Sequence, residues 1–93
     1  MREREIEQKF TRAVKQRGGL ALKFMSPGFD GMPDRLALFP DGKMGFVEVK
    51  VSGKVPRPLQ VQRHRLLREL GFRVYVLDDQ RQIGGIIDDI QSP

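Results

Sequence analysis

The 93-residue sequence contains no cysteine, no tryptophan, one tyrosine and one histidine, His64. The absence of cysteine excludes disulfides, thiolate metal sites and thiol catalysis. A single histidine excludes a histidine-rich zinc site within one chain. No apolar run approaches the roughly 18 residues of a membrane span, and no apolar segment of a signal peptide follows the N-terminal Met-Arg-Glu-Arg-Glu. We therefore expect an intracellular protein without a membrane partner.

Excess positive charge is the main feature of the composition. Lysine and arginine total 17, whereas aspartate and glutamate total 12, which gives a formal net charge of +5. This excess favours a polyanionic partner such as nucleic acid, although many small basic proteins bind none. The length allows one domain, residues 1–93. Because so short a chain buries a small fraction of its surface, we expect dimerisation to supply further burial.

The apolar pattern predicts alternating helices and strands. A helix from residue 3 to about 17 has apolar residues at helical spacing, and the Gly18-Gly19 pair ends it. Strands are predicted at 20–24, 34–39, 44–51 and 72–77, and further helices at 58–70 and 80–90. The order α-β-β-β-α-β-α indicates an α/β protein with a mixed sheet flanked by helices. We expect the helix at 58–70 to bury its leucines, Leu59, Leu66, Leu67 and Leu70.

Three charged residues of the second and third strands indicate phosphodiester chemistry. Glu48 and Lys50 point to one face of the third strand, because strand side chains alternate. Pairing across the intervening turn brings Asp34 near Glu48, so that two carboxylates can share a hard divalent cation such as Mg²⁺ or Mn²⁺. The carbonyl of Val49 can add a further ligand.

Lys50 has candidate roles that the residues leave open. Beside a cation, its ammonium can stabilise the phosphorane or orient the attacking water, and with a depressed pKa it can act as a general base. A simpler alternative is that Glu48 and Lys50 form a cross-strand salt-bridge pattern on a solvated sheet face. The apolar neighbours of the strand argue against this alternative, because they indicate burial on both faces, where unpaired charge is rare.

A helical carboxylate is expected to complete the metal site. Glu3 lies in line with the apolar stripe of the first helix, where a carboxylate is costly unless it is paired or metal-bound. Glu7 flanks the same stripe one turn later. We favour Glu3 as the metal-facing residue and keep Glu7 as the close alternative. A solvated helix start, which carries acidic residues favourably, explains either one equally well.

The second long helix and the loop before it carry the remaining candidates. Gln60, in the first turn, either hydrogen-bonds the scissile phosphate or a metal-bound water, or is an ordinary surface glutamine. Lys54, Arg57 and Arg63 are candidate contacts to DNA phosphates. We expect His64 to be a surface residue of the helix rather than a catalyst.

These residues resemble a known family. Gly31-x-Pro33-Asp34, Glu48-x-Lys50 and Pro58-Leu59-Gln60, at this spacing, are similar to the motifs of the virus-type replication-repair nuclease (VRR-NUC) domain. That domain has the restriction-endonuclease-like core of the PD-(D/E)xK superfamily. The resemblance runs from Arg2 to about Asp78 and includes features of the stand-alone phage and bacterial members. It implies that Asp34 and Glu48 bind the metal with help from an N-terminal glutamate, that Lys50 is catalytic and that Gln60 is the family's helix glutamine.

The resemblance also implies a substrate. Small stand-alone members are similar to Holliday-junction resolvases and cut branched DNA as homodimers. We therefore expect a structure-selective DNA endonuclease of repair or recombination, without a small-molecule cofactor, in the cytoplasm of a bacterial or phage-infected cell. The hairpin of the third strand, the Phe29 loop or the last helix can supply the dimer surface. The alternatives are a nuclease for flaps, nicks or linear duplex DNA, such as a restriction-type subunit, and a non-catalytic DNA-binding module.

Overall fold

Helices and strands alternate along the chain, and the computed structural model of the protein describes residues 1–93. The elements are α1 (Glu3–Gln16), β1 (Leu20–Lys23), β2 (Arg35–Leu38), β3 (Met44–Val49), α2 (Pro58–Glu69), β4 (Val74–Leu77) and α3 (Ile83–Gln91), with short 3₁₀ turns at Pro40–Gly42 and Gln80–Gln82. The predicted order of elements is confirmed, and each observed strand is one or two residues shorter than predicted. No helix is long and apolar enough to cross a membrane.

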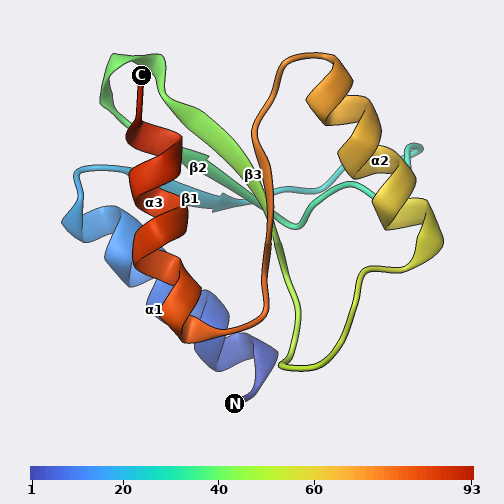
Figure 1. Ribbon diagram of the computed structural model, residues 1–93, viewed down its shortest axis with the longest axis horizontal. Helices are drawn as coiled ribbons and strands as arrows, with labels where there is room; N and C mark the ends of the chain where they lie inside the picture. The colour runs from blue at the N-terminus through green and yellow to red at the C-terminus, as the bar shows by residue number, and fades with distance from the viewer.

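The four strands form one mixed sheet in the order β1-β2-β3-β4. β1 and β2 pair in antiparallel orientation, as do β2 and β3, whereas β3 and β4 are parallel. The β2–β3 hairpin closes through Pro40–Gly42, where both Asp41 and Gly42 adopt positive φ angles of 66° and 73°. The crossover that parallel strands require is made by α2. Figure 1 shows the resulting sheet with its helices, which confirms the predicted α/β fold with a mixed sheet.

One face of the sheet is covered by α1 and α3, which lie side by side (Figure 1). Ile6, Phe10 and Val14 of α1 are all 0% exposed and fall on one helix face at i, i+4 and i+8. They meet the buried isoleucines of α3, which are Ile83, Ile86, Ile87 and Ile90. Each such side chain contributes about 1.5–3 kcal/mol when fully buried, so this cluster is the main core. Because the isoleucines of α3 are buried within the chain, they do not form an exposed surface for a second copy.

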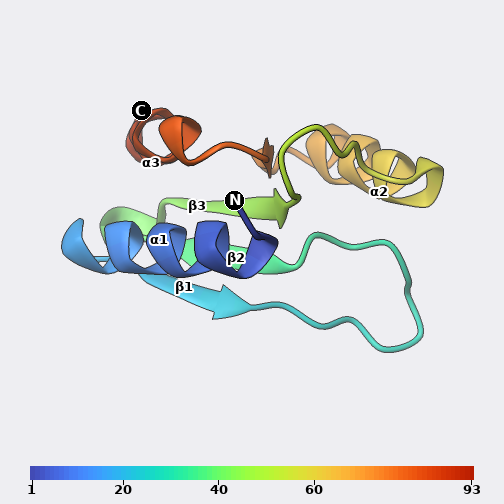
Figure 2. The same ribbon diagram turned by 90° about the horizontal axis from the view of Figure 1, so that it is seen from below.

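Away from α1 and α3, α2 lies at the opposite end of the molecule (Figures 1 and 2). Its buried residues are Gln60, His64 and Leu67. The prediction that its leucines face inward is wrong for three of the four, because Leu59, Leu66 and Leu70 are 40%, 36% and 64% exposed. The inward face is polar because it meets Glu48, a buried carboxylate of β3 that needs hydrogen-bond donors.

Candidate active site

Asp34 is held at the point where β2 begins. Pro33 before it is fully buried, and the register of β2 against β3 pairs the next residue, Arg35, with Val47. Asp34 therefore lies beside the end of β3, where its Oδ1 accepts a hydrogen bond from the N–H of Val49 at 3.1 Å. This bond fixes the carboxylate while Oδ2 keeps its full acceptor capacity.

Glu48 lies on β3 with only 3% of its side chain exposed. Its Oε2 accepts a hydrogen bond from Nε2 of Gln60 at 3.2 Å, and its Oε1 lies 3.4 Å from Nε2 of His64. Each oxygen therefore has one neighbour on α2 and retains a second lone pair. The alternative that placed Glu48 on a solvated sheet face is wrong, because the side chain is enclosed between β3 and α2.

The amide of Gln60 is fixed at both ends. Its Oε1 accepts the N–H of Arg57 at 2.9 Å, which caps the first turn of α2, and its Nε2 donates to Glu48. Pro58 occupies the first helical position, where its missing N–H costs nothing. With 6% of its surface exposed, Gln60 is not an ordinary surface glutamine. Its contact with a phosphate or a metal-bound water stays a prediction.

His64 is the residue whose place the sequence analysis missed. It is 3% exposed, and one helical turn separates it from Gln60 on the same inward face of α2. Burial lowers the pKa of its imidazole, and Arg68 and Lys50 lower it further. Since an ionised carboxylate only accepts hydrogen bonds, a neutral His64 beside ionised Glu48 carries its proton on Nε2. The expectation of a surface histidine is therefore wrong. The signal available in the sequence was the spacing of residues 60, 64 and 67.

The two helical glutamates occupy different environments at the start of α1. Glu3 is exposed, whereas Glu7 is half-buried and its Oε1 lies 3.4 Å from Nε of Arg35. Both raise the pKa of Asp34, and Glu7 has the larger effect. No group of three or more His, Cys, Asp or Glu side chains is arranged to hold a metal ion. A part for Glu3 or Glu7 in metal binding therefore stays a prediction.

Comparison with known proteins identifies the family. No protein-family model matches the chain. It is 48% identical over 80 residues to "Putative nuclease p44" of Acyrthosiphon pisum secondary endosymbiont phage 1, which covers 86% of each protein. It also matches a solved structure, "VRR_NUC domain", with a TM-score of 0.87 and 31% identity over 92% of this chain and 94% of that one. The chain belongs to the VRR-NUC family of nucleases.

The two site carboxylates of this VRR-NUC chain, half-buried Asp34 and buried Glu48, have raised pKa values. Burial is the largest cause for both, and it raises the pKa of Asp34 to about 6 and the pKa of Glu48 to about 7. The charge of Asp34 raises the pKa of Glu48 further, because two like charges lie close together. At neutral pH Glu48 is therefore only partly ionised, and positive charge between or beside the two carboxylates favours ionisation of both.

Lys50 and Arg57 supply part of that positive charge. Both lower the pKa of Glu48, Lys50 more strongly, which places their charges within electrostatic range of the carboxylate. Lys50 follows the last residue of β3, and its backbone N–H continues the pairing with β4 by donating to the carbonyl of Leu77 at 2.9 Å. The Lys50 backbone is therefore anchored to the sheet, whereas its half-buried side chain has no hydrogen-bond partner in the protein.

The predicted DNA contacts of the VRR-NUC domain fall into two groups. Lys54 and Arg57 are exposed on the loop before α2. Arg63 instead holds the loop between β1 and β2, because its Nε donates to the carbonyl of Asp30 at 2.7 Å and its guanidinium lies 3.9 Å from the ring centroid of Phe29. The structure thus gives Arg63 a structural role, and its contact with DNA stays a prediction.

Proposed function

We propose that this protein is a metal-dependent DNA endonuclease whose active site is formed by Asp34, Glu48 and Lys50. The observation that carries the proposal is a pair of carboxylates with raised pKa values, buried Glu48 and half-buried Asp34, beside a lysine that has no hydrogen-bond partner. Oxygen ligands of this kind suit Mg²⁺ or Mn²⁺, and Mg²⁺ commonly binds through one or two carboxylates and keeps several waters. The donor set therefore fits such an ion without a third carboxylate.

Asp34 and Glu48 would hold the ion, with the Val49 carbonyl as a further candidate ligand. The ion would supply Lewis-acid polarisation of the phosphoryl oxygen and a bound water of lowered pKa. Lys50 then stabilises the negative charge that develops on the phosphorane or orients the attacking water. Because the pKa values of the two carboxylates are about 6 and about 7, the site carries its full negative charge only above about pH 7.

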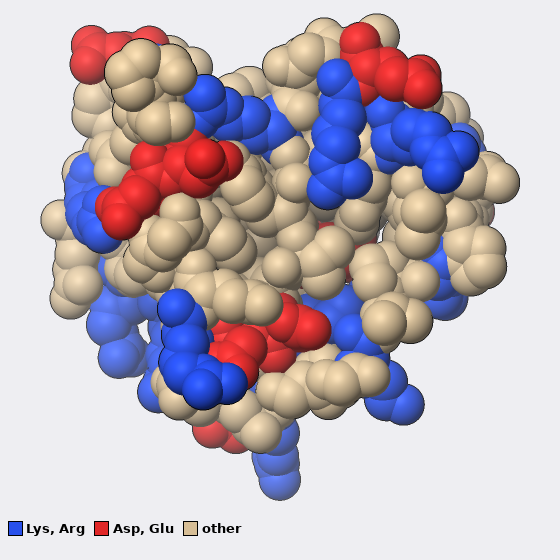
Figure 3. Space-filling view, in the orientation of Figure 1, with Lys and Arg blue, Asp and Glu red and all other residues tan.

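Branched DNA is the substrate that we propose for a homodimer of this chain. A two-fold dimer presents two active sites at a fixed spacing, which selects DNA by shape and not by base sequence. The chain is basic overall, and Figure 3 shows lysine and arginine side chains gathered over α2 and along the lower edge of that face. These charges favour contacts to phosphates on both sides of a branch point.

The first test removes the proposed catalytic groups one at a time. Lys50→Ala and Asp34→Ala are compared with the wild type on a synthetic four-way junction in Mg²⁺, with Lys9→Ala, an exposed lysine of α1, as the matched control. We expect both site variants to cut at least about 100-fold more slowly, the order of magnitude for losing one charge-stabilising group. Junction binding should persist, and Lys9→Ala should cut normally. Undiminished cutting by either site variant would show that the substituted residue is not part of the active site.

Two alternatives are separated by the same materials. A panel of junction, flap, nicked and linear duplex DNA at equal concentration distinguishes a resolvase-like enzyme from a nuclease for other structures. Isothermal titration with Mn²⁺ distinguishes the enzyme from a non-catalytic DNA-binding module. The enzyme should release or absorb heat that Glu48→Ala loses, whereas wild-type protein that gives no heat would favour the module.

A further inference from the structure

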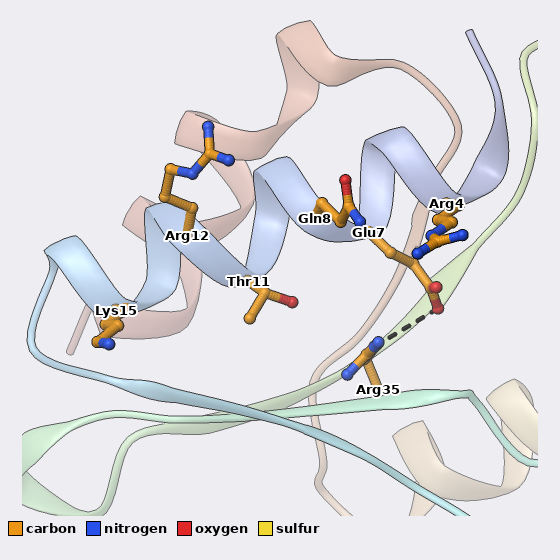
Figure 4. Close-up of a pocket in the computed structure, with 7 residues that line it drawn as sticks. All are labelled: Arg4, Glu7, Gln8, Thr11, Arg12, Lys15 and Arg35. Atoms are coloured by element: carbon orange, nitrogen blue, oxygen red, sulfur yellow. Dashed lines mark ion pairs between the residues drawn. The ribbon is translucent and has the colours of Figure 1, made fainter.

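A polar groove runs along α1 on the side that faces β2. Its volume is about 620 Å³, and all of its lining side chains are polar or charged. Figure 4 shows Arg35 reaching from β2 toward Glu7, with Arg4 beside them and Thr11 and Lys15 farther along the helix. Apart from Glu7, which stays a predicted metal-facing residue, none of the lining residues belongs to the catalytic proposal or to the predicted DNA contacts.

Positive charge dominates the groove. Four cations line it, Arg4, Arg12, Lys15 and Arg35, against the single carboxylate of Glu7. The first three are exposed and form no hydrogen bond or ion pair within the chain. Arg35 is 82% buried at its side chain, and its Nε has no hydrogen-bond partner, because the 3.4 Å contact with Glu7 is not a well-formed hydrogen bond. The groove therefore has several donors available to an anion.

One end of the groove adjoins the candidate active site. Arg35 follows Asp34 directly in the chain, and the charge of Glu7 is close enough to Asp34 to raise its pKa. From Arg4 to Lys15 the helix rises about 16 Å, which is roughly the rise of five nucleotides in one strand of B-DNA. An extended polyanion that passes the carboxylates can therefore continue along α1.

We propose that this groove binds the phosphate backbone of the DNA arm that flanks the cleavage point. This inference rests on the proposed nuclease function and adds a path for the substrate. Duplex backbone is favoured over single-stranded DNA, because the groove contains no aromatic side chain on which unpaired bases can stack. Arginine, lysine, glutamine and threonine side chains are typical donors to phosphate oxygens, and such contacts carry no base sequence information.

The salt dependence of DNA binding tests the groove. The variant Arg4→Gln/Arg12→Gln/Lys15→Gln removes three charges from it, and Lys9→Gln/Lys43→Gln/Arg81→Gln removes three charges elsewhere. Binding of a labelled duplex is measured by anisotropy in Ca²⁺ in place of Mg²⁺, at several salt concentrations, after thermal melting has confirmed that both variants fold. The slope of log K against log salt is negative, and we expect the groove variant to reduce its magnitude by about 2–3. The control should change the magnitude by less than 1.

The outcomes separate the groove from the chemistry. Equal slopes for the two variants, or a wild type that binds no duplex, would overturn the proposal that the groove binds DNA. Since binding is measured without cleavage, a wild type that binds through the groove but cuts no DNA would refute the nuclease proposal alone. If the wild type cuts DNA and the two variants have equal slopes, only the proposal that the groove binds DNA is refuted.

Discussion

At the scale of single residues, the site depends on how Glu48 is held. Gln60 and His64 approach different oxygens of the same carboxylate, and both come from one face of α2. Groups that hydrogen-bond a metal-binding carboxylate orient it and commonly affect metal affinity by about 10–100-fold. His64 is therefore expected to matter through the position of Glu48, although it need not touch the substrate.

Substitution of His64 tests this dependence. His64→Leu introduces an apolar side chain of similar size and removes the donor, so we expect Mn²⁺ affinity, measured by isothermal titration at pH 8, to fall about 10–100-fold. His64→Gln keeps an amide donor near the position of Nε2 and should restore a large part of that affinity.

Thermal melting of both variants without metal separates positioning from packing. If the two variants lose the same affinity, or if His64→Leu binds Mn²⁺ like the wild type, His64 does not position Glu48. If His64→Gln binds Mn²⁺ more tightly than His64→Leu without being more stable to heat, the difference in affinity does not come from packing.

At the scale of elements, the loop between β1 and β2 is what fixes Asp34 relative to α2. Gly31 of this loop has a φ angle of 88°, and a Cβ there would lie 2.8 Å from Cγ of Leu59. Arg63 holds the neighbouring carbonyl of Asp30 from the same helix. The glycine of the Gly31-x-Pro33-Asp34 motif is therefore required by both its backbone conformation and its close approach to α2.

Gly31→Ala and Gly28→Ala form a matched pair for this element. Gly28 has a similar φ angle of 81°, but no atom lies within 4 Å of a Cβ placed there. We expect Gly28→Ala to cost about 1–2 kcal/mol of unfolding free energy from backbone strain alone. Gly31→Ala should cost about 1–3 kcal/mol more from overpacking against α2. Urea unfolding measures both values. Equal losses of unfolding free energy in the two variants would show that the Leu59 side chain moves aside without cost.

The elements themselves were largely predictable, whereas the orientation of α2 was not. Apolar periodicity located every helix and strand, and Gly18 and Gly71 ended the two long helices through positive φ angles of 79° and 95°. The leucines of α2 suggested the wrong inward face, because burial there is decided by Glu48, a residue on another element. Periodicity records which side chains are apolar, but it does not record which buried carboxylate a helix must satisfy.

The same limit applies to the site. Asp34 and Glu48 could be brought together from sequence, because hairpin register follows from the turn and the alternation of side chains. The burial of His64, the hydrogen bond from Val49 to Asp34 and the pairing of Glu7 with Arg35 depend on contacts between distant elements. Such contacts have no local pattern in the chain.

At the scale of the whole molecule, one sheet face is left partly uncovered. Cross-strand partners share a face, so Leu20, Leu38 and Met44 form one row across three strands, and Leu22, Leu36 and Phe46 form the next. Leu20 and Leu22 are 54% and 41% exposed. Contiguous exposed apolar surface of this kind commonly marks an interface, and this face suits the two-fold contact of the proposed homodimer.

Sedimentation of Leu22→Lys tests this surface. In a two-fold dimer the same residue occurs on both sides of the contact, so each substitution buries two ammonium groups and opposes association. We expect the wild type and Val55→Lys, a control on a loop residue that is 79% exposed, to sediment as dimers. Leu22→Lys should sediment as a folded monomer at the same concentration, with circular dichroism as the check on folding. A monomeric wild type would refute the homodimer. A dimeric Leu22→Lys would move the contact elsewhere, with the outward leucines of α2 as the next surface to test.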